Sequence, residues 1–208
     1  MKAILVGAAI GGKLDKKQAE NSLVIAVDGG YKTLKDADIF PDIALGDFDS
    51  YGGEVVPKEV IPLPVAKDDT DMFYAIKLAL SKGCNEIFIY GGTGGRLDHS
   101  LANLQSMRYI VRHGSTAVMF FESQTSIATD KGVYFTSQAK GNIGAVSLTP
   151  ESVISNSGLL YKADNLKISD DFPIAVSNTF TGEGGYIKVE SGMILVITST
   201  DNFQFLKF

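Results

Sequence analysis

In the first part of the chain, short uninterrupted apolar runs alternate with segments whose apolar residues recur at the helical period. The runs are rich in Val, Ile, Leu and Phe, and they occupy residues 2–9, 22–27, 43–45, 60–63, 86–90 and 117–121. Runs of this kind are typical of strands that are buried on both faces of a parallel sheet. The pattern therefore predicts an α/β arrangement with a parallel sheet.

Two segments between these runs have the period of an amphipathic helix. In residues 70–82 the apolar positions are Met72, Ala75, Ile76, Ala79 and Leu80. Asp69 or Thr70 is suited to cap the start of this helix, and Gly83 is suited to end it. In residues 98–113 the predicted stripe is Leu97, Leu101, Leu104, Met107 and Val111, closed by Gly114.

The helical period disappears after about residue 122. Short β-prone runs separated by Ser, Thr, Gly and Asn follow, at residues 126–128, 132–135, 143–148, 159–161, 174–176, 186–189 and 193–198. Such spacing predicts an antiparallel β-sandwich. We expect two domains: a Rossmann-like parallel-sheet domain over residues 1–123 that binds nucleotide and metal, and a β-sandwich domain over residues 124–208.

Composition supports a globular protein and restricts its partners. Of the 208 residues, 45% are hydrophobic and 21% charged, which suffices for a core. The net charge of −5 opposes binding to nucleic acid or to an anionic membrane, so we expect neither partner. The first apolar run suits a strand better than a signal peptide, which favours a cytoplasmic protein. Cys84 is the single cysteine, so an intrachain disulfide is excluded and a packing role is expected.

Acidic, glycine and arginine residues follow several of the predicted strands. The second strand leads into Asp28-Gly29-Gly30, the third into GDFDS at residues 46–50, and the fifth into GGTGGR at residues 91–96. Asp71 lies in the first turn of the helix that follows the fourth strand. Each feature taken alone is also typical of an ordinary turn or helix start. The carboxyl ends of parallel strands share one edge of a sheet, however, and ligands of such sheets bind there. Four such segments at one edge indicate a binding site.

The carboxylates in GDFDS indicate a metal ion. In extended chain, Asp47 and Asp49 point to the same side about 6.6 Å apart, and the nearest basic residues in the sequence are Lys35 and Lys58. Oxygen ligands without His or Cys favour Mg²⁺ or Ca²⁺. The glycines of residues 91–95 let backbone N–H groups approach phosphate oxygens, and Arg96 adds a forked cationic donor. Together these residues are suited to a metal-bound nucleotide.

Six segments together resemble the thiamine pyrophosphokinase family. They are VDGG, GDFDS, KDDTDMFYA (residues 67–75), GGTGGRLDHSLAN (residues 91–103), SGLLY (residues 157–161) and SNTF (residues 177–180). The resemblance is specific because the segments occur in the family's order. It implies a nucleotide-carrying α/β domain, a β-sandwich, and a homodimer whose subunits both contribute to the thiamine cleft. The implied reaction moves the pyrophosphoryl group of ATP onto the hydroxyl of thiamine, giving thiamine diphosphate and AMP, with Mg²⁺ required.

The resemblance also implies roles for individual residues. The metal ligands are Asp28, Asp47, Asp49 and Asp71. ATP and its phosphates are expected at Gly29, Gly92, Thr93, Gly94, Gly95, Arg96 and Lys67. The catalytic residues are Asp71, Asp98 and Lys67, with the general base open between Asp71 and Asp98. Thiamine is expected at Asp98, Ser177 and Asn178. Some members stack thiamine on a tryptophan, which this chain lacks, so we consider Phe180 or Tyr186 in that role.

Two other functions fit the residues. A different Mg²⁺-dependent phosphotransferase or nucleotide hydrolase would use the same carboxylates and release ADP or phosphate. A Ca²⁺-stabilised β-sandwich binding module would use the acidic loops as structural ion sites and would have no affinity for ATP. The binding module leaves Arg96 and the glycine-rich loop without a role.

Overall fold

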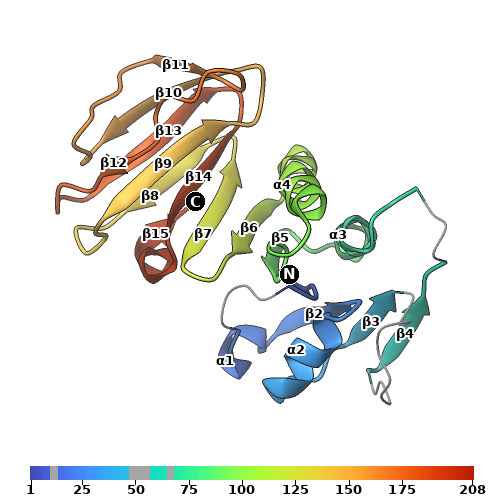
Figure 1. The fold of residues 1–208 in the computed structure, drawn as a ribbon. Helices are drawn as coiled ribbons and strands as arrows, with labels where there is room; N and C mark the ends of the chain where they lie inside the picture. Colours follow the sequence, from blue (N-terminus) through green and yellow to red (C-terminus); the bar gives the residue numbers. More distant parts are fainter. Residues whose placement is uncertain (10–13, 47–56, 65–67) are drawn as a thin grey trace. The chain divides into compact units, whose positions relative to one another are not determined.

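The computed structural model describes residues 1–9, 14–46, 57–64 and 68–208 (Figure 1). The predicted site residues Asp47, Asp49 and Lys67 therefore lie outside the described residues. The chain divides into two compact units, Met1–Glu122 and Ser123–Phe208, and each is described by itself. No helix in the described ranges is long and apolar enough to span a membrane.

The first unit is built on a parallel sheet, as the apolar runs predicted. Its strands are β1 (Lys2–Val6), β2 (Ser22–Val27), β3 (Ile43–Gly46), β4 (Glu59–Pro62), β5 (Glu86–Tyr90) and β6 (Thr116–Phe120). Their order across the sheet is β6-β5-β1-β2-β3-β4, and every neighbouring pair is parallel. The central strand β1 is fully buried from Ala3 to Val6 because helices cover both faces.

Four helices accompany this sheet: α1 (Lys16–Ala19), α2 (Gly30–Asp36), α3 (Asp71–Ser81) and α4 (Leu97–Arg112). The chain moves from β1 to β3 in one direction and from β4 through β5 to β6 in the other. Connections between parallel strands are right-handed crossovers, so reversing the direction along the sheet places the connecting helices on the opposite face. Accordingly α1 and α2 cover one face of the sheet, and α3 and α4 cover the other (Figure 1). The α1 and α2 helices were not predicted, since each is short and carries few apolar residues.

The predicted bounds of α3 are confirmed, whereas the predicted stripe of α4 is wrong in its first turns. Thr70 caps α3, accepting a hydrogen bond from the Phe73 N–H at 3.1 Å. In α4, Leu97 and Leu101 are 72% and 52% exposed. Burial along α4 begins with Asn103 and continues through Met107 and Ile110. Leu97 begins α4 directly after the exposed Gly94, Gly95 and Arg96, and Leu101 lies one turn further along. Among the described residues, no neighbouring element buries either leucine.

The second unit consists of two antiparallel sheets. The first contains β7 (Gln124–Thr129), β9 (Asn142–Ser147), β12 (Asn178–Thr179) and β14 (Ile194–Ser199), in the order β12-β9-β14-β7. The second contains β8 (Gly132–Phe135), β10 (Glu151–Ser157), β11 (Leu166–Ser169), β13 (Gly185–Ser191) and β15 (Leu206–Lys207), in the order β11-β10-β13-β8-β15. A 3₁₀ helix, η1 (Thr200–Phe205), precedes β15. The sheets face each other, since Ile143 of β9 lines the same cavity as Ile154 of β10 and Ile187 of β13.

Two of the strands predicted in this unit are wrong, and four strands were missed, namely β10, β11, β12 and β15. Residues 159–161 and 174–176 form no strand; Leu159 makes only an isolated bridge to Phe180, and Ala175 has a φ of +66°. The longest missed strand is β10, whose sequence ESVISNS is mostly polar. The other three have four residues or fewer, so they show too little alternation to be recognised. Ser152 of β10 is fully buried, and its hydroxyl donates to the Met193 carbonyl at 2.9 Å. A hydrogen-bonded serine facing inward hides the apolar alternation by which a strand is recognised.

Candidate active site

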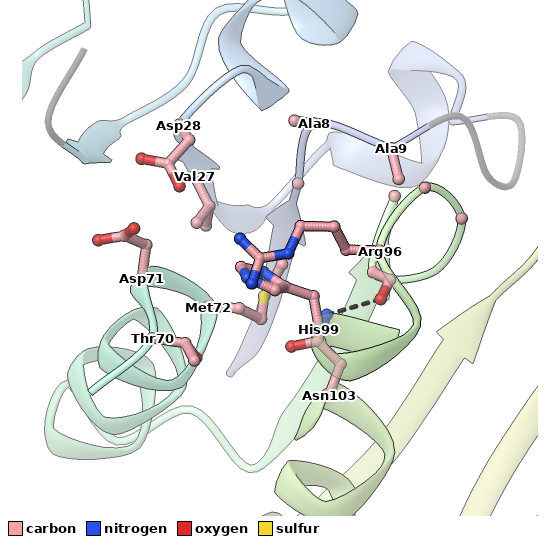
Figure 2. Close-up of a pocket in the computed structure, with 15 residues that line it drawn as sticks. Ala8, Ala9, Val27, Asp28, Thr70, Asp71, Met72, Arg96, His99 and Asn103 are labelled. Carbon is pink, nitrogen blue, oxygen red and sulfur yellow. Dashed lines mark hydrogen bonds between the residues drawn. The ribbon is translucent and has the colours of Figure 1, made fainter. Parts of the chain in front are cut away.

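A pocket opens at the carboxyl edge of the parallel sheet, between β1 and β5. These neighbouring strands continue in opposite directions, β1 towards β2 and β5 towards β6, so the loops after them diverge and leave a crevice. The cavity has a volume of about 590 Å³. Its lining comprises Gly7, Ala8, Ala9, Val27, Asp28, Thr70, Asp71, Met72, Gly91, Gly92, Gly94, Gly95, Arg96, His99 and Asn103 (Figure 2).

Backbone packs directly on backbone where the strands end. The Gly7 N–H donates to the Tyr90 carbonyl at 2.8 Å. A Cβ on Gly91 would lie 2.5 Å from the Gly7 carbonyl oxygen, and Gly91 has a φ of +63°. A side chain at Gly91 is therefore excluded by both space and conformation. The pocket can be lined by backbone at this point because no side chain is present.

Asp28 and Asp71 supply carboxylates on one side of the pocket (Figure 2). Asp28 directly follows β2, has a φ of +48°, and donates its backbone N–H to the Leu45 carbonyl at 2.9 Å. A Cβ on Gly46 would lie 2.0 Å from the Asp28 carboxylate oxygen Oδ1. The end of β3 therefore passes close against Asp28, and only glycine leaves room for that carboxylate. Gly46 is the first residue of the GDFDS segment.

The start of α3 fixes the position of Asp71. Thr70 caps the helix, and Asp69 forms an ion pair with Lys77, eight residues further along the chain. The Phe73 ring packs edge-on against Tyr109 of α4, with ring centroids 4.9 Å apart. These contacts hold the first turn of α3, so the Asp71 carboxylate projects from an anchored element.

Among the described residues, no group of three His, Cys, Asp or Glu side chains lies close enough to hold a metal ion. Asp28 and Asp71 are the two predicted ligands that the structure brings to the pocket. Both are hard oxygen donors, and Asp47 follows Gly46 directly in the sequence. This donor chemistry fits Mg²⁺, which is commonly bound by one or two carboxylates together with phosphate oxygens and water.

Arg96 lines the pocket and forms a bidentate ion pair with Asp98. Arg96 Nη2 lies 2.6 Å from Asp98 Oδ2, and Arg96 Nε lies 3.1 Å from Asp98 Oδ1. The hydrogen bond from Arg96 lowers the pKa of Asp98 to about 2. The same hydrogen bond raises the pKa of Arg96 above its ordinary value. Both side chains are largely exposed, so an incoming anion can compete for the guanidinium. Asp98 itself does not line the pocket.

The glycine-rich loop between β5 and α4 contributes Gly91, Gly92, Gly94 and Gly95 to the lining, whereas Thr93 does not line the pocket. The Gly94 N–H donates to the Ser100 hydroxyl at 3.3 Å. The Asn103 side-chain amide donates to the Gly92 carbonyl at 2.6 Å. Gly29, also predicted to contact ATP, lies outside the lining and is the N-cap of α2.

The predicted thiamine residues Ser177 and Asn178 lie in the second unit. Ser177 is exposed and has a φ of +58°. Asn178 is 8% exposed, and its side chain is engaged by the backbone. Its Oδ1 accepts from the N–H groups of Tyr161 and Thr179, each at 2.9 Å, and its Nδ2 donates to the Tyr161 carbonyl at 2.7 Å. Asn178 therefore holds the chain at Tyr161.

The structure distinguishes among the aromatic residues considered for stacking. Phe180 is 8% exposed and packs edge-on against Phe135 at 4.8 Å, so its faces are covered. The expectation for Phe180 is wrong because this ring belongs to the core. Tyr186 pairs with Tyr134 across β13 and β8. Tyr161 is 65% exposed, and sequence reasoning did not single it out.

Comparisons with known proteins identify the family of this chain. Residues 14–120 match the family model described as thiamin pyrophosphokinase, catalytic domain. The chain belongs to the thiamine pyrophosphokinase family. Thiamine pyrophosphokinase from Bacillus subtilis is 31% identical over 192 residues, covering 88% of this chain and 89% of that protein. Thiamin pyrophosphokinase 1 from Caenorhabditis elegans is 27% identical, covering 83% of this chain and 77% of that protein.

Solved structures of the thiamine pyrophosphokinase family have the same fold. The structure of the Bacillus subtilis protein has a TM-score of 0.82 and 27% identity, covering 96% of this chain and 99% of that one. A thiamin pyrophosphokinase family protein from Enterococcus faecalis has a TM-score of 0.81 and 26% identity, covering 97% and 100%. The chain is thus an enzyme of this family, and the β-sandwich binding module considered above is wrong.

For this thiamine pyrophosphokinase family member, sequence reasoning missed part of the pocket lining. Gly7, Ala8 and Ala9 after β1 line the pocket, as do Thr70 and Met72 at the start of α3. The sequence did contain a signal for the loop after β1, because small residues at the end of a buried strand leave room for a ligand. Asn103 gave no comparable signal, since only the packing of α4 determines which carbonyl its amide meets.

Proposed function

We propose that the chain transfers the pyrophosphoryl group of ATP to the hydroxyl of thiamine, giving thiamine diphosphate and AMP. The observation that carries this proposal is the pocket itself, in which carboxylates, a glycine-rich loop and Arg96 meet at the switch point of a parallel sheet. Family membership supplies the class of reaction and the acceptor. The volume of about 590 Å³ is ample for a nucleotide polyphosphate.

In this proposal Asp28 and Asp71 hold Mg²⁺, together with Asp47 and Asp49 outside the described residues. The oxygen-only donor set and the space that Gly46 leaves beside Asp28 support the assignment. When bound, Mg²⁺ neutralises charge on the phosphate oxygens. The carboxylates on their own would repel ATP, so nucleotide affinity should depend on the divalent cation.

The polyphosphate lies, in this proposal, along the glycine-rich loop, including Thr93, and near Gly29. The loop offers backbone N–H groups, and Arg96 offers a planar guanidinium suited to phosphate oxygens. Arg96 then exchanges its partner Asp98 for phosphate. Lys67, outside the described residues, joins Arg96 in neutralising the charge that develops on the oxygen between the α and β phosphorus atoms.

The chemical step forms a bond between the thiamine hydroxyl oxygen and the β phosphorus. The bond from the β phosphorus to the α–β bridging oxygen breaks, and AMP leaves with the electron pair. The hydroxyl proton passes to a carboxylate, for which Asp71 and Asp98 are the two candidates. Because Arg96 lowers the pKa of Asp98 to about 2, Asp98 takes up a proton poorly until Arg96 has moved to phosphate.

For thiamine we propose contacts from Asp98, Ser177 and the exposed ring of Tyr161. Asn178 contributes indirectly, because its amide is engaged in holding Tyr161. Tyr161 is favoured over Phe180 and Tyr186 because it is exposed and its backbone is fixed beside the SNTF segment. An aromatic face at this place would stack on the rings of thiamine. The family resemblance adds a homodimer to the proposal, and the first apolar run, which suits a strand better than a signal peptide, adds a cytoplasmic location.

The test is incubation with ATP, Mg²⁺ and thiamine, followed by identification of the nucleotide product. AMP that appears only when thiamine is present supports the proposal. ADP, or phosphate released without thiamine, would instead indicate the Mg²⁺-dependent phosphotransferase or hydrolase. Replacing Mg²⁺ with EDTA should abolish turnover, and Asp47→Asn or Asp49→Asn should do the same while leaving the unfolding midpoint unchanged.

A further inference from the structure

Asn103 is a polar residue of the pocket lining that lies buried in the body of a helix. It is 7% exposed and sits in α4, which packs on α3 and β6. Its Nδ2 donates to the Gly92 carbonyl at 2.6 Å, eleven residues earlier in the chain. Figure 2 shows this hydrogen bond beside Arg96 and His99. A side chain from an anchored helix thus reaches back to the glycine-rich loop.

Packing already determines where Gly92 lies. A Cβ on this residue would come within 2.8 Å of both the Ile89 Cγ2 atom and the Met119 sulfur. The backbone of Gly92 therefore rests directly on side chains of β5 and β6. This contact fixes the location of the loop but leaves open which way its peptide groups face.

The direction of the Gly92 peptide requires a further restraint. The Gly92 carbonyl belongs to the peptide unit that joins Gly92 to Thr93, and glycine at position 92 lets this unit rotate at lower cost than a larger residue would. In a planar trans peptide the carbonyl and the following N–H point in opposite directions. Rotation would turn the negative end of the Gly92 carbonyl towards a bound phosphate. A hydrogen bond from a buried amide opposes that rotation.

We propose that Asn103 is a positioning residue for the nucleotide: it keeps the Gly92 carbonyl turned to α4, so that the loop presents N–H groups to the polyphosphate. This inference rests on the proposed function of the pocket. Asn103 does not touch the reacting atoms in this role. Its removal should weaken nucleotide binding far more than it affects thiamine.

The experiment compares Asn103→Ala and Asn103→Asp with a matched control. Asp has the shape of Asn but no amide donor, so it separates hydrogen bonding from packing. The control is Ser106→Ala, one turn further along α4, where the buried hydroxyl donates to the Ala102 carbonyl of the same helix at 2.8 Å. Binding of Mg·ATP is measured by calorimetry without thiamine, and the KM values for ATP and thiamine are measured by AMP formation.

We expect Asn103→Ala to raise the Kd and KM for Mg·ATP about tenfold, equivalent to about 1.4 kcal/mol. Asn103→Asp should raise them further, because its carboxylate repels both the Gly92 carbonyl and the polyphosphate. The KM for thiamine should stay within about twofold in both variants, and Ser106→Ala should match the wild type. Circular dichroism melts set an assay temperature at which every variant is folded.

Three outcomes separate this inference from the function on which it rests. If wild type and Ser106→Ala form AMP but both Asn103 variants bind Mg·ATP normally, the positioning role is overturned. If the KM values for ATP and thiamine rise equally together with a lower melting temperature, Asn103 acts only in structure and the inference is again overturned. If the wild type binds Mg·ATP yet forms no AMP, the proposed function fails, while calorimetry still decides the role of Asn103.

Discussion

Each unit of the molecule fixes a loop with one buried asparagine, but the two loops are held in different ways. In the first unit, Asn103 makes a single hydrogen bond to the Gly92 carbonyl in a loop whose later glycines are exposed. In the second unit, Asn178 bonds both the N–H and the carbonyl of Tyr161, and also the N–H of Thr179. In the first loop the hydrogen bond restrains one carbonyl group and so the direction of one peptide unit. In the second loop the hydrogen bonds restrain both backbone groups of Tyr161 and so fix the position of that residue.

The difference fits what each loop is proposed to bind. A polyphosphate is recognised by backbone N–H groups that must all face one way, so orientation is the property that matters. A flat aromatic ligand is recognised by the face of a side chain, so the position of one residue matters. Removing the first asparagine should therefore change affinity, and removing the second should change stability as well.

The largest effect on activity should come from replacing a pocket carboxylate. In our proposal the carboxylates take part in the reaction, whereas the two asparagines only position loops. Asp71→Asn should lower kcat on the order of 10³-fold, because it removes a proposed charged metal ligand from an otherwise unchanged pocket. The measurement is AMP formation at saturating ATP and thiamine, with a denaturant titration to verify folding. Turnover within tenfold of the wild type would remove Asp71 from the site. Exposed Asp36→Asn, on α2 and outside the pocket lining, is a matched control.

The second largest effect should come from removing Asn178, which holds the loop of the second unit at Tyr161. Asn178→Ala should reduce the free energy of unfolding by about 2 kcal/mol, because the Tyr161 N–H loses its partner in a part-buried place. It should also raise the KM for thiamine. Denaturant unfolding measures the first quantity. Ser177→Ala, at an exposed neighbouring position, should leave the free energy of unfolding unchanged. A stable Asn178→Ala variant would contradict the comparison of the two asparagines.

A smaller effect should distinguish the ring of Tyr161 from its backbone. Tyr161→Ala should raise the KM for thiamine about tenfold, because an aromatic contact is worth about 1 kcal/mol or somewhat more. Tyr161→Phe keeps the aromatic face and should stay close to the wild type. The KM for ATP should not change in either variant. Equal kinetics for Ala and Phe would show that another residue stacks on thiamine.

The smallest effect concerns the exposed pair of Arg96 and Asp98. Arg96 holds the pKa of Asp98 near 2, below the ordinary value of 3.8, so the ion pair is complete above the ordinary value and is lost as the pH falls through about 2. In Arg96→Ala the pKa of Asp98 should rise towards 3.8, as measured by NMR titration of the carboxyl carbon. The unfolding midpoint should not move, because both side chains are exposed. Saturating Mg·ATP should produce the same rise in the wild type if Arg96 exchanges Asp98 for phosphate.

Prediction from the sequence succeeded where burial follows a local pattern. The uninterrupted apolar runs predicted the parallel sheet, and parallel strands necessarily bring their carboxyl ends to one edge. Asp28, Asp71 and Arg96 consequently line one pocket although they are far apart in the sequence. Prediction failed for β10, where buried serine satisfied by hydrogen bonds replaced apolar alternation. It also failed for Leu97 and Leu101 in the first two turns of α4, which no element in the described part of the chain buries.

The local sequence pattern therefore predicts the parallel-sheet unit, the edge at which its acidic and glycine-rich segments gather, and the chemistry that those segments can support. Which partner each polar or aromatic side chain meets follows only from how the elements pack. Asn103 meets the Gly92 carbonyl, Asn178 holds Tyr161, and Phe180 packs into the core. The physical reason is that apolar periodicity records only whether a position is buried. A hydrogen bond or a ring contact depends on the distance and direction between elements that packing brings together.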